Sequence, residues 1–572
     1  MPGFEKLSSR VSRRTILKTS AAGAAVSLLA AGGTVAAEAA GSRADAPALS
    51  PQDAGTPTPT PPTPKPGGTI IYNIAQEGSH LVPPFSSFST VIEPTVPFFN
   101  GLTRPGVDRE PTPDLAESWT ANTDGTHYVF KLRQGVTWHD GQPFTAADVK
   151  FTWELIANPK NTTAAQLYSF FSKIVGADDF HTGKATEITG IKAADDLTLD
   201  VTLASPWAPF LTIASNQYIV PKHILGDIAV DKILEDGYAR APIGTGPFTF
   251  KAWQAGDSII GEAFDNYYGG RPYADTIVMR VAGLDANGEL SALDSGELNE
   301  SDLTLVQADT LTGDSAVVLN ERAGEANQYV EFNLAKPLFQ DVNVRKALSY
   351  ALDRNAISQA VWQGRAQIYN SVFPYDWWCT KKDTTIFDND ADQAKKLLDA
   401  AGWTVGSDGI REKDGTKFSF TAYSISPDWS LVVQQQWKAI GIDVKLQMVD
   451  FPKLSTQYYT THLFDVVFLN IPYTLYTDPH YSLPGYFLSA NNRNAYKNPK
   501  SDELIIAAAS TNDQEQRKQL YYQWQELIAQ DVPHLWIGNP TAPTAYSAGL
   551  YYPDRSSSYF SWREIRDWYW TE

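Results

Sequence analysis

Two hydrophobic periodicities alternate along the chain from about residue 67 to its end, and they restrict the fold more than any other feature. Apolar residues at every second position predict strands with one buried face, at 128–132, 197–203 and 444–448. The spacing i, i+3, i+4, i+7 predicts amphipathic helices, at 344–352, 394–401 and 520–528. Alternation over about 500 residues predicts an α/β or α+β protein of several lobes.

Three of the expected helix ends carry recognisable capping residues. Asp341 stands where an N-cap is needed before the helix at 344–352. Gly402 follows the helix at 394–401 as a stop signal. Thr511 and Gln514 have the spacing of a capping box before the third helix.

Composition restricts the classes of function. The chain has 46 Lys and Arg against 65 Asp and Glu, a formal net charge of −19. So acidic a surface repels phosphate backbones, and we expect no nucleic-acid partner. Cys379 is the single cysteine, which excludes an intramolecular disulfide and a zinc site of several thiolates. Aromatic residues make up 12% of the chain, enough to fill a core and to line a stacking pocket.

No catalytic motif stands out. None of the eight His pairs at a metal-ligand spacing, and neither a G-x-S-x-G elbow nor a Walker loop occurs. We interpret His139-Asp140, within Trp-His-Asp-Gly, as a turn rather than a catalytic pair. We interpret Gly244-Thr245-Gly246 as a tight turn that leads into a strand. We therefore predict no enzyme activity, no metal and no cofactor; a secreted hydrolase with paired carboxylates is the distant alternative.

The N-terminus is predicted to be an export signal over residues 1–39. Residues 12–18, Ser-Arg-Arg-Thr-Ile-Leu-Lys, resemble the twin-arginine motif, and a weakly hydrophobic Ala/Gly-rich stretch follows. Ala37-Glu38-Ala39 fits a cleavage site, and no Cys lies nearby to carry a lipid. The chain is therefore expected to be exported, periplasmic or at the cell surface, with the signal either cleaved or retained as an anchor.

Residues 40–66 are predicted to be a linker. Its Pro/Thr-rich part from 51 to 66 cannot bury enough apolar surface to fold, so it is expected to extend as a polyproline II spacer. The folded body is expected to begin near Gly67.

From Gly67 to about Pro540 the chain resembles the family 5 extracellular solute-binding proteins, the oligopeptide, dipeptide and nickel binders. The resemblance is carried by segments spread over the body: Pro113–Trp119 (PDLAESW), Tyr128–Val149 (YVFKLRQGVTWHDGQPFTAADV), Ile243–Phe248 (IGTGPF), Asp265–Gly270 (DNYYGG), Leu293–Glu297 (LDSGE) and Val342–Asp353 (VNVRKALSYALD).

This resemblance implies a two-lobed, type II periplasmic-binding-protein-like fold that closes on a solute about a hinge. It also implies delivery to an ABC permease in the membrane, and we expect a monomer. The implied boundaries are lobe I at 67–325 with an extra subdomain at about 101–215, lobe II at 326–536, and a return to lobe I at 537–572. Hinge strands are expected near Tyr329 and Ile537.

One position departs from the peptide-binding pattern of the family. In those binders an Asp holds the ligand's amino group, and Leu475 stands at that position here, although Asp478-Pro479 matches. An α-ammonium group without this partner loses about 1.5–3 kcal/mol. The expected solute is therefore oligopeptide-like, and an oligosaccharide is the alternative, because sugars stack on aromatic rings. A sensory role on the same fold is a third alternative.

The resemblance places eight residues at the ligand. Two serines lie in the lobe I strip, and the others lie in lobe II segments that face the cleft in the family. The set is Ser87, Ser89, Trp377, Trp429, Asn470, Tyr473, Tyr476 and Asp478.

Overall fold

The computed structural model describes residues 62–74, 77–86, 89–106, 109–163, 165–215, 217–281, 286–311, 316–322, 324, 326–450, 453–454, 456–472, 477–551 and 562–571. The predicted signal at 1–39 and most of the predicted linker at 40–66 lie outside them. Residues 62–572 form a compact unit of their own. Within the described part, no helix combines the length and the apolar character needed to cross a membrane.

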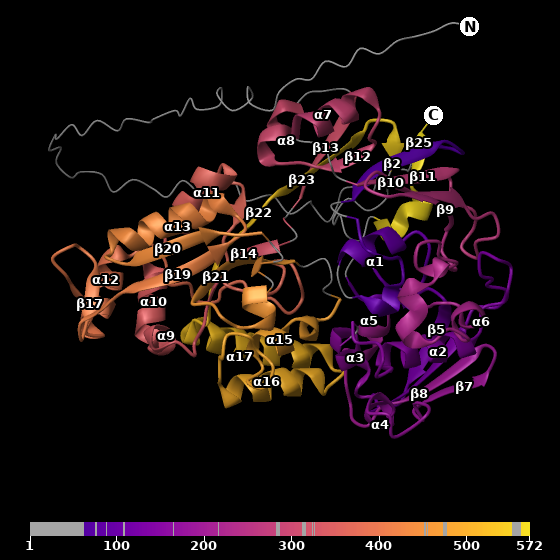
Figure 1. Cartoon of the computed structure of the whole chain (residues 1–572), viewed down its shortest axis with the longest axis horizontal. Helices are drawn as coiled ribbons and strands as arrows, with labels where there is room; N and C mark the ends of the chain where they lie inside the picture. Colours follow the sequence, from indigo (N-terminus) through magenta and orange to yellow (C-terminus); the bar gives the residue numbers. More distant parts are fainter. Residues whose placement is uncertain are drawn as a thin grey trace, which may run out of the picture. The chain divides into compact units, whose positions relative to one another are not determined.

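A seven-stranded mixed sheet organises the part of the chain that we call lobe I (Figure 1). In spatial order its strands are β13 (Val317–Arg322), β23 (Ala542–Ser547), β12 (Glu300–Asp302), β2 (Thr69–Ile74), β11 (Thr276–Val281), β10 (Ser258–Ala263) and β9 (Phe248–Gln254). The late strand β23 pairs with both β12 and β13. Lobe I is therefore built from both ends of the described chain.

A six-stranded sheet organises lobe II. In spatial order its strands are β15 (Ala366–Gln367), β22 (His534–Pro540), β14 (Ala326–Phe332), β21 (Val466–Pro472), β19 (Ser419–Ser424) and β20 (Asp443–Met448). The strands β19, β20 and β21 run parallel, and β14 runs antiparallel to β21 and β22. The expected α/β class is confirmed.

A third, antiparallel sheet has its own core, and we call it the small sheet. Its strands are β5 (Ala116–Ala121), β6 (His127–Leu132), β8 (Thr198–Thr202) and β7 (Ile191–Asp195). The helices α2 to α5 lie around it (Figure 1). Large buried rings, including Phe130, Trp138 and Trp153, fill the core between them.

The remaining strands form three short sheets. These are β1 (Pro64–Lys65), β25 (Tyr569–Thr571) and β24 (Leu550–Tyr551); β16 (Thr404–Val405), β17 (Arg411–Lys413) and β18 (Thr416–Lys417); and β3 (Thr103–Pro105) with β4 (Pro111–Pro113). The strand β1 pairs with β25, so the end of the predicted linker is joined to the C-terminal segment.

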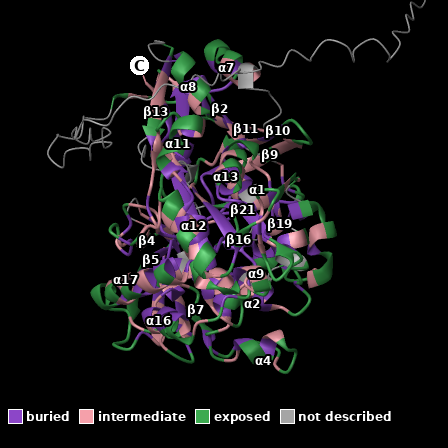
Figure 2. Ribbon diagram, turned by 90° about the vertical axis from the view of Figure 1, so that its left-hand side faces the viewer, coloured by how far each residue is buried: buried purple, intermediate pink, exposed green. Residues whose placement is uncertain are grey.

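The helices pack their apolar sides on these sheets, and Figure 2 shows buried and exposed residues alternating along helices such as α12. The α-helices are α1 (Ser89–Thr95), α2 (Ala146–Ala157), α3 (Ala165–Phe171), α4 (Ala177–His181), α5 (Phe210–Ser215), α6 (Lys222–Leu225), α7 (Ala286–Ser295), α8 (Leu305–Leu311), α9 (Pro337–Gln340), α10 (Val342–Tyr350), α11 (Arg354–Trp362), α12 (Ala391–Ala400), α13 (Pro427–Ala439), α15 (Leu483–Phe487), α16 (Pro499–Ala509) and α17 (Gln514–Asp531). Shorter turns are η1 (Pro83–Phe85), η2 (Val230–Glu235), η3 (Gly237–Ala239), η4 (Thr456–Thr460), η5 (Pro479–Tyr481) and η6 (Trp562–Asp567).

Two of the three predicted helix ends are confirmed. The Asp341 side chain accepts from the Asn343 backbone N–H at 2.8 Å and caps α10. Gly402 follows α12 with φ at +86°. The predicted capping box before α17 is wrong: Asp513 is the N-cap and accepts from Gln516 N–H. A carboxylate directly before the helix is the stronger cap, and it leaves Thr511 bonded to the Gln516 side chain.

Both interpreted turns are confirmed. Gly141 N–H donates to Trp138 O and closes the Trp-His-Asp-Gly turn. Asp140 pairs instead with His223, 2.8 Å away. Gly244 to Gly246 leads into β9, and a Cβ added at Gly244 would stand 1.8 Å from the carbonyl oxygen of Phe98.

The chain passes between the two large sheets twice, from β13 to β14 and from β22 to β23. The crossings lie a few residues from Tyr329 and Ile537. They approach each other closely, because a Cβ added at Gly324 would lie 1.8 Å from the carbonyl oxygen of Pro540. These two segments connect the two large sheets.

Candidate functional site

The carboxyl ends of the parallel strands in lobe II lie at one edge of its sheet. In register, Ser424 of β19 lies opposite both Met448 of β20 and Phe468 of β21. Ligands of open α/β sheets bind outside this edge. The hydroxyl of Ser424 stabilises the turn after β19. It accepts from the N–H of Ser426 at 3.1 Å and donates to the carbonyl oxygen of Ser426 at 2.9 Å.

Lobe I offers a matching edge. The strand β2 is parallel to β11 and β12, so Ile74, Val281 and Asp302 end on one side of the sheet. The chain leaves β2 through the segment that contains His80 and α1. His80 is buried, and its Nδ1 accepts from Val82 N–H at 3.2 Å. Burial lowers the pKa of His80, so this segment is anchored by a neutral imidazole.

Asp478, predicted to contact the ligand, is engaged by the protein itself. Its exposure is 1%, and both carboxylate oxygens lie 2.9 Å from Nη2 of Arg517 on α17. Burial alone would lower the pKa of Arg517, but the charge of Asp478 raises it overall. The Arg517 guanidinium also lies 5.5 Å from the ring centroid of Trp378. The two charges compensate each other in the interior.

The two predicted tryptophans are both in contact with protein. Trp429 is 3% exposed, and its ring lies 5.2 Å from that of Phe468 in the core of lobe II. Trp377 is 7% exposed, and the guanidinium of Arg109 from lobe I lies 5.5 Å from its ring centroid. Asn470, by contrast, is exposed at the end of β21. Of these three, Asn470 alone presents an open polar side chain at the sheet edge.

The side chains of the other four predicted residues are not described by the structure. Ser87, Tyr473 and Tyr476 lie outside the described residues, and Ser89 lies in α1 where the side chains of its first turn are not described. Sequence reasoning missed Arg517 and Arg109. No local signal pairs Asp478 with Arg517, because 39 positions separate them.

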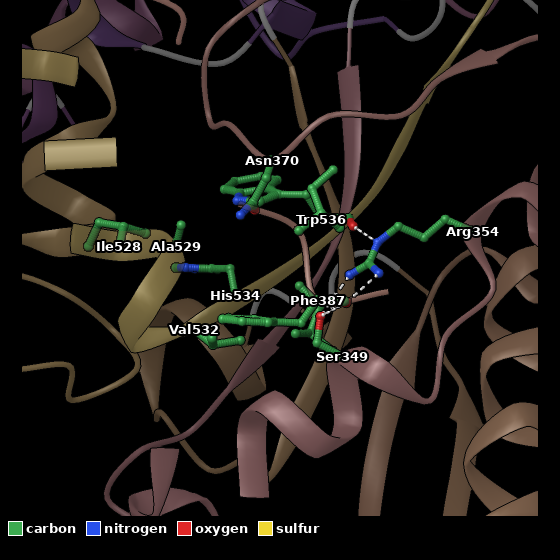
Figure 3. A pocket seen from close by; sticks show the side chains of 11 residues that line it. Ser349, Arg354, Asn370, Phe387, Ile528, Ala529, Val532, His534 and Trp536 are labelled. Atoms are coloured by element: carbon green, nitrogen blue, oxygen red, sulfur yellow. Dashed lines mark hydrogen bonds between the residues drawn. The ribbon is translucent and has the colours of Figure 1, made fainter. Parts of the chain in front are cut away.

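Two cavities within lobe II do not coincide with the sheet edge. The first has about 10 Å³ and is lined by Ser349, Arg354 and Trp536 among others (Figure 3). Arg354 donates to Trp536 O and to Ser349 Oγ there, and the volume suits a single water. The second has about 380 Å³, and its Arg345 donates to backbone carbonyls of α9 and α17. Neither cavity lies between the two large sheets, since all of their lining residues belong to lobe II.

The described residues contain no cluster of three or more His, Cys, Asp or Glu side chains that could hold a metal ion. The buried acid–base pair closest to a catalytic arrangement is Glu331 and His534, whose Oε2 and Nε2 are 3.4 Å apart. Both side chains are fully buried in the lobe II sheet, and Tyr458 donates to Glu331. The pair is sealed from any solute.

Comparison with known proteins identifies the architecture. The family model of bacterial extracellular solute-binding proteins, family 5, middle part, matches residues 110–494, more than half of the chain. The chain belongs to this family. Its relatives are solute-binding proteins of transport systems and not enzymes.

Relatives in the family are similar over most of their length. The oligopeptide-binding protein AppA of Bacillus subtilis (strain 168) is 31% identical over 461 residues, 77% of this chain and 81% of AppA. The dipeptide-binding protein of Escherichia coli (strain K12) is 27% identical over 495 residues, 80% of this chain and 86% of that protein.

A solved structure supports the same assignment. Bacillus subtilis AppA in complex with a nonapeptide superposes with a TM-score of 0.74 at 28% identity, covering 89% of this chain and all of AppA. The two-lobed periplasmic-binding-protein fold expected from the sequence is therefore confirmed.

Proposed function

We propose that the chain is the extracytoplasmic solute-binding component of an ABC importer. It captures an oligopeptide-like solute between the carboxyl edges of its two large sheets and delivers it to a membrane permease. The observation that carries this proposal is the 31% identity to an oligopeptide-binding protein over 77% of the chain. The carboxyl edges of the two sheets, with Asn470 exposed near that of lobe II, support it.

The proposal includes the organisation inferred from the sequence. Lobe I comprises 67–325 with its subdomain at about 101–215, and lobe II begins at 326. The boundary expected at 536/537 falls within β22, which belongs to the lobe II sheet, so the return to lobe I begins after Pro540. A twin-arginine signal at 1–39 exports the chain, and the protein acts as a monomer.

An uncharged solute such as an oligosaccharide is the second candidate. It is favoured by Leu475 at the position of the amine-binding Asp. The burial of Asp478 against Arg517 adds to it, because that carboxylate is already neutralised. The burial of Trp377 and Trp429 removes two of the rings on which a sugar would stack.

Matched ligands test the proposal. The full chain is mixed with a nonapeptide, with its N-acetylated form and with a maltooligosaccharide, and the melting temperature is recorded. A ligand at a hundredfold its Kd stabilises by about 2.7 kcal/mol. We expect both peptides to raise the melting temperature to similar extents, because Leu475 stands where the amine-binding Asp of the family stands.

A substitution sharpens this test. Leu475→Asp is expected to create a preference for the free-amine peptide of about tenfold or more. Stabilisation by the oligosaccharide alone would replace the first candidate by the second. A strong preference of the unsubstituted chain for the free amine would show that another carboxylate serves the amino group.

A further inference from the structure

The small sheet touches lobe II at a surface separate from the crossings between the large sheets. The backbone N–H of Ala208 donates to the carbonyl oxygen of Ala509 at 2.8 Å. Nearby, the hydroxyl of Thr477 donates to the carbonyl oxygen of Thr212 at 3.2 Å. Thr212 lies in α5 and Ala509 ends α16, which Figure 1 draws in purple and gold. Ala509 thereby belongs to the buried core of the small sheet, although it ends a lobe II helix.

Side chains extend this surface on both sides. Gln514 at the start of α17 donates to Glu110 Oε1 at 2.9 Å. The rings of Phe170 and Tyr481 lie 5.2 Å apart, and Tyr481 packs against the cores of both the small sheet and lobe II. These polar and apolar contacts together make the surface a packed interface.

Gly125 shows how closely the two sides fit. This residue lies in the turn between β5 and β6, is buried and has a φ of +69°. A Cβ added there would stand 1.9 Å from Nδ2 of Asn512, in the loop between α16 and α17. A residue with a Cβ fits at this position only if the Asn512 side chain moves away from it.

We propose that these contacts, between residues 109–128 and 170–212 on one side and 477–481 and 509–514 on the other, form a latch that holds the lobes closed without a solute. The latch rests on the lobe closure of the proposed function. Its hydrogen bonds and ring contacts are satisfied by protein alone. The latch therefore sets the fraction of the empty chain that is closed.

This role has a consequence for affinity. A solute that binds the closed form sees an apparent Kd equal to its intrinsic Kd divided by the closed fraction. The latch thus scales the affinity for every solute by the same factor. Residues at the strand ends decide which solute is chosen.

A glycine pair tests the latch without any ligand. Gly125→Asn places a side chain where the Asn512 amide lies while the two sides are in contact, so it should disfavour that contact, and Asn tolerates positive φ. Gly135→Asn is the matched control, because Gly135 lies in the next turn of the small sheet at φ +79° with nothing within 4 Å of its Cβ position. Both variants carry the same backbone cost.

Spin labels report the distance between the two sides in the full chain. Cysteines replace Lys184 and Lys500, whose side chains are 72% and 55% exposed, while native Cys379 is buried and stays unlabelled. Pulsed spin resonance is expected to show a closed, short-distance population in the unsubstituted chain. In Gly125→Asn the closed-to-open ratio should fall about tenfold or more, and in Gly135→Asn it should be unchanged.

Two results would overturn the latch: an empty chain that is entirely open, or a Gly125→Asn variant that keeps the closed population. Should Gly125→Asn fail to fold, Gln514→Glu places a carboxylate against Glu110 while favouring the N-terminus of α17. It should open the lobes at low salt and less so at high salt, and an unchanged closed population at low salt contradicts the latch. A chain that closes but binds no peptide refutes the proposed function and leaves the latch intact.

Discussion

The carboxylate of Asp478 compensates the charge of the Arg517 guanidinium, which is buried in the interior. Arg517 is 8% exposed, and Asp478 is the anionic partner within 4 Å that the described residues give it. Removing one member of a buried ion pair leaves the other charge without compensation, which costs about 3–5 kcal/mol. Asp478 therefore has a structural role whatever the solute is.

Asp478→Asn is expected to lower the free energy of unfolding by about 3 kcal/mol, measured by urea denaturation. Asp179→Asn, at a side chain that is 66% exposed, is the control and should change it by less than about 0.5 kcal/mol. A fully stable Asp478→Asn protein that no longer binds peptide would instead assign the carboxylate to the solute.

Individual site residues could be predicted only in part, for two physical reasons. Trp429 follows β19 as expected, but α13 begins at Pro427 and brings the ring onto Phe468. A shift of one or two residues in a helix start moves a side chain between cleft and core. Pro427 marks where the helix starts, but not which of its side chains face the core. The sequence predicts Asp478 to contact the ligand, but its pairing with Arg517 depends on tertiary packing.

His139 joins two turns of lobe I as a neutral ring. Its Nδ1 accepts from Gly244 N–H at 3.1 Å, and its Nε2 therefore carries the proton, 3.0 Å from the carbonyl oxygen of Gly246. Burial lowers the pKa of His139 to about 4. The unfolded chain, with a pKa of 6.5, binds the proton first as the pH falls.

The stabilising contribution of neutral His139 is thus complete above pH 6.5 and is lost as the pH falls toward 4, by up to about 1.4 kcal/mol per pH unit. His139→Gln should flatten the pH dependence of unfolding in this window. His462→Gln, at an exposed position, should leave it as it is. Burial lowers the pKa of His480 to about 4 as well, so the free energy of unfolding of His139→Gln should still depend partly on pH. If His139→Gln has the same pH dependence as the unsubstituted chain, His139 is not its source.

At the scale of elements, the turn from Gly244 to Gly246 packs the start of β9 closely against the backbone around Phe98, which precedes the small sheet. Gly246 N–H donates to Phe98 O at 2.9 Å, and backbone atoms occupy the space that a side chain would need. The requirement for glycine here is close approach of two backbones, since neither φ is in the left-handed region.

Gly244→Ala is therefore expected to destabilise the chain by about 3 kcal/mol or more, seen as a lower melting temperature. Gly237→Ala is the matched control, because its φ is also outside the left-handed region and nothing lies within 4 Å of its Cβ position. It should change stability by less than about 0.5 kcal/mol. Equal effects of the two substitutions would mean that the backbone at Gly244 yields easily.

Elements whose signals are local were predicted well. The ends of α10 and α12 depend on Asp341 and Gly402, which act within one turn of the helix. The start of α17 was misplaced because Thr511 and Asp513 compete for the same N–H groups and the pattern does not rank them. Strand order was not predictable in this way, since β23 joins β12 and β13 from the far end of the sequence.

On the scale of the whole molecule, the apolar cores separate by lobe. The clusters around Val330 and Tyr329 belong to lobe II, and those around Ile70, Phe130 and Leu298 belong to lobe I and its small sheet. The exceptions are residues at the two contact regions, such as Ala509 and Leu305. Each lobe thus carries nearly all of its own hydrophobic stabilisation.

Separate cores predict that the empty chain does not unfold in a single step. Calorimetry should show two transitions, with a calorimetric enthalpy larger than the van 't Hoff enthalpy. Gly125→Asn should move the transitions further apart, because the latch is one of the few contacts that couples them. A bound peptide should bring them together, since it contacts both sheets and stabilises only the state in which both lobes are folded. One two-state transition in the empty Gly125→Asn protein would show that contacts outside the latch transmit cooperativity between the lobes.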